Sequence, residues 1–183
     1  MAELTEKIKD YMSSTTVKHD RLMARLSEFL AVEQGGKKIY QRALQMARDP
    51  EVQKKFQIFY EQTIKHEEIL SRIIRELGGD PTWMSPTAQL AEAKAAGLLR
   101  TLDQTEGLTP KQVELNAMEN VVLAEAKDHA DWELLGKIAR QTTDSTLSKI
   151  LKPAVDEVEP EEDQHLNWTK TQMAQLSMDA LSE

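Results

Sequence analysis

The sequence contains no cysteine, and this absence excludes several kinds of chemistry. A chain without a thiol can form no disulfide, thiol nucleophile, iron-sulfur cluster or thiolate metal site. Glycine and proline are also scarce, with 7 and 6 residues among 183. The remainder is rich in alanine, leucine, glutamate, lysine and glutamine, so the composition favours helices.

Long apolar runs and clustered positive charge are missing as well. No apolar stretch approaches the roughly 18 residues that a membrane-spanning helix requires, and the first residues lack the apolar stretch of a signal peptide. The net charge is -8 and no basic face is evident, which argues against a nucleic-acid partner. We therefore expect a cytoplasmic protein that partners neither membrane nor nucleic acid.

Apolar residues at helical spacing predict four long helices. They cover, in order, residues 17–48, 50–77, 110–141 and 145 onward. Pro153 and Pro160 fall inside the last helix, so we expect a break or kink just ahead of Glu162. The predicted domains are a short N-terminal helical appendage, a helical bundle and a C-terminal tail, over 1–16, 17–177 and 178–183.

A connection of about 35 residues, from 78 to 112, separates the second and third long helices. Its interior, 86–102, is rich in alanine and predicts a short additional helix. A tight turn would make the two flanking helices antiparallel neighbours. A connection this long can instead cross the bundle, so that the two helices run parallel.

Each long helix carries an ionisable residue on its apolar stripe. These residues are Glu33, His66, Glu125, Glu162 and His165. Glu162 and His165 are three residues apart and therefore face the same way. A carboxylate and an imidazole facing a core carry a heavy desolvation cost unless they are paired, and a metal ion is one such partner. Helical bundles use this Glu-x-x-His spacing for carboxylate-bridged pairs of metal ions.

The two halves of the chain repeat part of this pattern. Glu33 is followed by Tyr40 seven residues later, and Glu125 by Trp132 seven residues later, with an alanine seven residues further in each half. The alanine precedes the inward histidine by 19 residues in the first half and 26 in the second. The difference of seven is about two helical turns, which leaves the inward face unchanged. The glutamate and histidine of one half are thus equivalent to those of the other, and we expect Trp132 to serve packing.

On these residues the chain resembles the ferritin-like superfamily, which includes bacterioferritins and rubrerythrins, over about residues 17–176. The resemblance implies an all-α four-helix bundle with one long crossover, and a site for two iron or manganese ions. In that family two helices each supply a glutamate and the other two each supply Glu-x-x-His. It also implies a tyrosine that hydrogen-bonds a ligand carboxylate, matched here by Tyr40. The matching metal ligands are Glu33, His66, Glu125, Glu162 and His165.

One position departs from the family pattern. The motif that ends at His66 begins with Thr63, where the family has a bridging glutamate. Three carboxylates leave one positive charge of two divalent ions unbalanced in a low-dielectric site, so one ion is expected to be weakly held or absent. Glu67 or His129 could supply a ligand, and each could equally lie on the rim. Haem is not expected, because Ile64 stands where haem-binding members have methionine.

Two functions of different classes fit the sequence. The first is a redox metalloprotein whose iron or manganese admits dioxygen or peroxide, as in a ferroxidase or a peroxidase-type oxidoreductase. The second is a redox-inactive ferritin-like scaffold that serves as a stress-related or partner-binding bundle, with Glu33, His66 and Glu162 as a buried polar network. Metal titration separates the two. A homodimer is the expected oligomer from the prevalence of two-fold assemblies.

Overall fold

The computed structural model describes residues 15–182 and consists mainly of α-helices. The helices are α2 (His19–Met46), α3 (Pro50–Glu76), α4 (Pro86–Leu102), α5 (Pro110–Gln141) and α6 (Ser145–Leu181). No β-strand occurs between residues 15 and 182, so the predicted all-α fold class is confirmed. The expected N-terminal appendage lies outside the described residues except for its last two positions.

Local sequence signals set the helix boundaries close to the predicted ones. Three helices begin with a proline that follows a capping residue, and the capping side chains accept hydrogen bonds from backbone N–H groups of the first turn. These caps are Asp49, Ser85 and Thr109. After α3 the chain reverses at Gly78, whose φ of 81° suits glycine and closes the last turn.

Helix α6 is longer and more regular than the sequence predicts. It runs unbroken through Pro153 and Pro160, so the expected break is absent. Both prolines are exposed. The carbonyl groups that lose a helical N–H partner therefore lie on the solvent side, where water can bind them. The helix also continues to Leu181, into the segment that was expected to be a tail.

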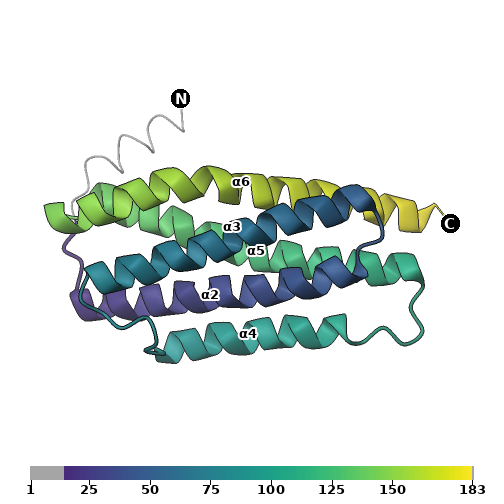
Figure 1. Ribbon diagram of the computed structural model, residues 1–183, viewed down its shortest axis with the longest axis horizontal. Helices are drawn as coiled ribbons and strands as arrows, with labels where there is room; N and C mark the ends of the chain where they lie inside the picture. Colours follow the sequence, from purple (N-terminus) through teal and green to yellow (C-terminus); the bar gives the residue numbers. More distant parts are fainter. Residues whose placement is uncertain (1–14, 183) are drawn as a thin grey trace.

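The four long helices pack as a ring, in which α2 contacts α3 and α5, and α6 contacts the same two helices. Figure 1 shows that α3 and α5 run in the same direction, opposite to α2 and α6, as the length of their connection predicted. Helix α4 lies outside the ring against α2 and α5. In the described part of the chain, no helix carries an apolar stretch sufficient to span a bilayer.

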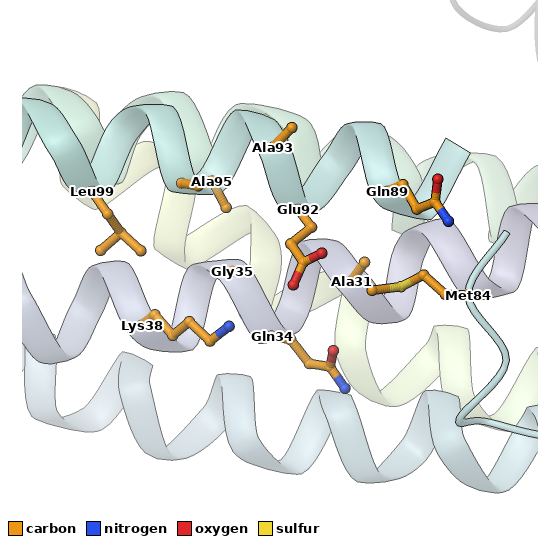
Figure 2. Close-up of a pocket in the computed structure, with 11 residues that line it drawn as sticks. Ala31, Gln34, Gly35, Lys38, Met84, Gln89, Glu92, Ala93, Ala95 and Leu99 are labelled. Carbon is orange, nitrogen blue, oxygen red and sulfur yellow. The ribbon is translucent and has the colours of Figure 1, made fainter. Parts of the chain in front are cut away.

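A glycine allows α4 to pack closely on α2. A Cβ atom at Gly35 would lie only 2.6 Å from Cβ of Ala95, which faces it from α4 (Figure 2). Glycine in a helix interior costs about 1 kcal/mol relative to alanine. The close contact offsets this cost and fixes α4 beside the part of α2 that carries Glu33.

The bundle interior consists of two apolar clusters with a polar layer between them. One cluster lies where α2 begins and α6 begins, and includes Leu26 and Leu151. The other lies toward the opposite end and includes Phe59 and Met118. Between them, five ionisable side chains are at most 2% exposed. They are Glu33, His66, Glu125, Glu162 and His165.

Candidate metal centre

Two groups of buried carboxylates and histidines meet at the middle of the bundle. Glu33, His66 and Glu162 form one group, and Glu125, Glu162 and His165 form the other. Within each group, one ligand-type atom from every residue lies within 4.8 Å of the others. Glu162 belongs to both groups. A carboxylate shared between two such groups is what a pair of bridged metal ions requires.

The shared carboxylate lies between the two histidine rings. His66 Nδ1 is 2.9 Å from Glu162 Oε1 and 3.8 Å from Glu33 Oε1. His165 Nδ1 is 3.4 Å from the same Glu162 oxygen and 3.3 Å from Glu125 Oε2. The rings stack with their centroids 5.8 Å apart. All four helices of the ring thus contribute ligand-type atoms to one small volume.

The outward nitrogen of each histidine is held by a residue of the neighbouring helix, α6 for His66 and α3 for His165. His66 Nε2 lies 2.8 Å from Glu161 Oε2, and His165 Nε2 lies 2.9 Å from Gln62 Oε1. Both oxygens are acceptors, so each Nε2 carries the proton and each Nδ1 directs a lone pair at the centre. Hydrogen bonds of this kind orient histidines that bind metals. Sequence reasoning missed Gln62 and Glu161, although each precedes a histidine of its own helix by four residues.

Two aromatic residues are directed at the glutamates of the opposite half. Trp132 Nε1 donates a hydrogen bond of 2.8 Å to Glu33 Oε1, so this residue does more than pack. Tyr40 occupies the equivalent position in the first half, and its hydroxyl faces Glu125 without completing a well-formed hydrogen bond. Burial, together with the negative charge of Glu125, raises the pKa of Tyr40 well above its usual value. The phenol therefore keeps its proton and remains a donor.

The two additional ligands considered from the sequence are engaged elsewhere. Glu67 forms an ion pair with Lys37 near the surface, and its side chain is 20% exposed. His129 Nε2 lies 2.7 Å from Asp163 Oδ1, also outside the two groups. Neither is among the residues whose ligand-type atoms converge in the centre.

A fourth carboxylate approaches the centre from α5. Thr63 offers none, and its hydroxyl donates to the carbonyl of Phe59 at 2.9 Å. Asp128 is 5% exposed, and its carboxyl group lies close enough to Glu33 to share a hydrogen bond when one of the two is protonated. Sequence reasoning missed Asp128, although its spacing of three residues from Glu125 places both on one helix face.

Burial changes the protonation of these groups. Desolvation raises the pKa of Glu33, Asp128 and Glu162 well above their ordinary values, and the negative charges of the neighbouring carboxylates add to the shift. Burial also lowers the pKa of His66 to about 4, so this imidazole is neutral at pH 7. Neutral imidazole is the form that binds metal ions. The mutual repulsion of the carboxylates favours any cation that enters.

Eight buried side-chain atoms have no hydrogen-bond partner within residues 15–182, and all belong to the five residues of the polar layer or to Tyr40 and Asp128 beside it. They are Glu33 Oε2, Tyr40 OH, His66 Nδ1, Glu125 Oε2, Asp128 Oδ1, both carboxylate oxygens of Glu162, and His165 Nδ1. Each such atom costs about 1–3 kcal/mol, and folded proteins contain few of them. Seven of the eight are lone-pair atoms of carboxylates or imidazoles, which divalent cations bind. The residues present therefore fit a metal ion.

These shifts predict how stability depends on pH in protein treated with chelator. The melting temperature should fall as pH rises from about 5 to 8. The pKa of Glu33, Asp128 and Glu162 is raised in the folded state, so their stabilisation is complete below the unfolded values of 4.5 and 3.8 and is lost at higher pH. His66 acts oppositely, because its lowered pKa gives stability above pH 6.5 that is lost toward pH 4.

The test is a series of thermal melts in EDTA, in which three carboxylates should outweigh one histidine. A melting temperature that is constant or rises over this interval would contradict the prediction. Metal-loaded protein is the control and should show the reverse trend, because metal ligands bind in their deprotonated forms.

Comparison of the chain with known protein families, with curated proteins and with solved structures gives no match. The fold and the site by themselves define an all-α helical bundle with buried carboxylate and histidine clusters that could hold metal ions.

Proposed function

We propose that this protein binds two iron or manganese ions between its four long helices and uses them to oxidise iron or to consume peroxide or oxygen. The observation that carries the proposal is the convergence of unpartnered lone pairs on one buried layer. A redox-inactive scaffold would gain nothing from these uncompensated groups, since a closed polar network satisfies its own donors and acceptors.

Each ion would be held by the glutamate and histidine of one half of the chain. Glu33 and His66 would hold the first, and Glu125 and His165 the second. Glu162 would bridge them, because it is the member common to both groups. Carboxylate and imidazole donors without sulfur suit iron and manganese.

The charge of the centre matches two ions better than the sequence alone suggested. Glu33, Glu125 and Glu162 supply three negative charges, and Asp128 beside Glu33 supplies the fourth. Two divalent ions carry four positive charges. A neutral cluster is the state that a buried site tolerates best, so Asp128 compensates for the carboxylate that Thr63 lacks.

Other side chains prepare the centre for the ions. Gln62 and Glu161 keep the histidine Nδ1 atoms directed inward. Trp132 donates a hydrogen bond to Glu33 Oε1, and Glu33 Oε2 would remain available to bind a metal ion. Tyr40 keeps its proton and would donate a hydrogen bond to Glu125. When bound, the metal ions would supply one-electron chemistry toward dioxygen or peroxide.

Elemental analysis tests the proposal directly. Protein purified without chelator and then loaded anaerobically with Fe²⁺ should contain about two metal ions per chain. Exposure of the loaded protein to oxygen or peroxide should oxidise the iron faster than the same concentration of free Fe²⁺ in buffer, which is the control. No bound metal after loading would contradict the proposal. Bound iron that reacts no faster than free iron would contradict its redox part.

A further inference from the structure

A pocket between α5 and α6 reaches the bridging carboxylate from the surface. It has a volume of about 230 Å³. Glu162 and Trp132 form its buried wall, and each is only 1% exposed. Both carboxylate oxygens of Glu162 lack a hydrogen-bond partner. A cation that enters this pocket therefore meets the residue common to both ligand groups.

Two other pockets do not reach the centre in this way. The pocket in Figure 2 lies between α2 and α4, where Gln34, Lys38 and Glu92 line it. An apolar groove between α2, α4 and α5 is lined by residues such as Leu98 and Leu123. Neither is lined by a residue of the two ligand groups.

The mouth of the pocket between α5 and α6 carries an excess of negative charge. Glu133, Glu159 and Asp163 contribute carboxylates, and Arg140 contributes the opposing positive charge. His129 lies between two of the acids, 2.7 Å from Asp163 Oδ1 and 3.8 Å from Glu133 Oε2. A cleft lined with charge of one sign raises the local concentration of counter-ions and the rate at which they arrive.

Glycine in α5 makes room for this arrangement. A Cβ atom at Gly136 would overlap Oε1 of Glu159 and would lie 3.0 Å from a guanidinium nitrogen of Arg140. Glycine in the interior of a helix is otherwise unfavourable by about 1 kcal/mol relative to alanine. Its presence lets the Glu159 carboxylate lie against the backbone of α5 at the pocket.

We propose that divalent cations reach the centre through this pocket, attracted by Glu133, Glu159 and Asp163. The proposal rests on the proposed function, because it requires that ions bind at the centre. The carboxylates at the mouth are not permanent ligands in this scheme. They increase the rate of loading and leave the number of ions bound at equilibrium unchanged.

The experiment follows Co²⁺ loading of chelator-treated protein by stopped-flow absorbance at low ionic strength, with equilibrium Co²⁺ content measured in parallel. The double variant Glu133→Gln/Asp163→Asn should load more slowly by on the order of tenfold, with unchanged content. Arg140→Gln should load faster than the native protein. The difference between native protein and the double variant should shrink at high salt, because added salt screens the attraction.

A matched control changes the same charge on the same two helices. Glu119→Gln/Asp179→Asn alters positions 14 and 16 residues from the pocket acids, or about 21 and 24 Å along the helices. This variant should load at the native rate.

Three results would overturn the proposal. Equal loading rates in the pocket variant and the control would place the route elsewhere. A lower Co²⁺ content in the pocket variant would make the acids ligands instead of guides. If the native protein binds no metal at equilibrium, the proposed function fails and the route fails with it. The equilibrium Co²⁺ content shows this result independently of the loading rates.

Discussion

Replacement of Glu162 by glutamine is expected to reduce the metal content from about two ions per chain to nearly none. Glu162 is the only residue shared by both ligand groups of the described chain, and its Oε1 lies within 3.4 Å of both histidine Nδ1 atoms. A neutral amide offers a weaker oxygen ligand and removes the charge that would lie between two cations. Elemental analysis after iron loading measures the effect.

The same substitution should have the opposite effect on stability without metal. Burial raises the pKa of Glu162, and both of its oxygens lack partners. The neutral amide removes the buried charge, and its two N–H groups can donate hydrogen bonds to the nearby carboxylates. Glu162→Gln should therefore stabilise chelator-treated protein by about 1–3 kcal/mol. Thermal melts with and without metal measure both effects.

Asp163→Asn is the control for Glu162→Gln, since Asp163 is the next residue but is exposed at the pocket mouth. It should retain the metal content and the stabilisation by metal. A lower melting temperature of Glu162→Gln in chelator, with no effect of metal on the native protein, would instead favour the redox-inactive scaffold. In that case the buried groups would act as a polar network and not as ligands.

The inward position of the five ligand-type residues could be predicted from the sequence, because each interrupts an apolar stripe of helical period. The two halves of the chain gave a second indication, since Glu33 and Glu125 have aromatic residues at the same spacing. The apolar patterns also predicted the long helices, and the length of the connection between α3 and α5 predicted that these two run parallel.

The partners of these residues could not be predicted in the same way. Gln62 and Glu161 each accept a hydrogen bond from a histidine of a neighbouring helix. A helical period shows which face of its own helix a side chain occupies, but not which residue of another helix it contacts. Asp128 lies on an inward face, yet acidic residues on helices are usually solvated, and only packing shows that this one is buried. The unbroken course of α6 also depends on the fold, because Pro153 and Pro160 both face solvent, where water can bind the carbonyl groups that lose a helical partner.

Asp128→Asn is expected to weaken the binding of one metal ion by on the order of 10- to 100-fold, with the other ion affected less. The substitution removes the fourth negative charge and the carboxyl group beside Glu33, while the five proposed ligands remain. Titration of chelator-treated protein with Mn²⁺ or anaerobic Fe²⁺ should show two unequal steps in place of two similar ones. Unchanged affinities would show that the centre does not need this charge.

Thr63→Glu should restore the weakened step when it is added to Asp128→Asn. It places a carboxylate at the position of α3 that corresponds to Glu162 in the internal repeat. The space is limited, because Thr63 is 1% exposed and a Cβ atom added at Gly36 would lie 3.8 Å from Thr63 Cγ2. The larger side chain should therefore destabilise the metal-free protein by about 1–3 kcal/mol through overpacking. Thr63→Gln has the same shape without the charge and is the matched control. Recovery with glutamate alone supports charge compensation, whereas equal recovery with glutamine would attribute the effect to packing.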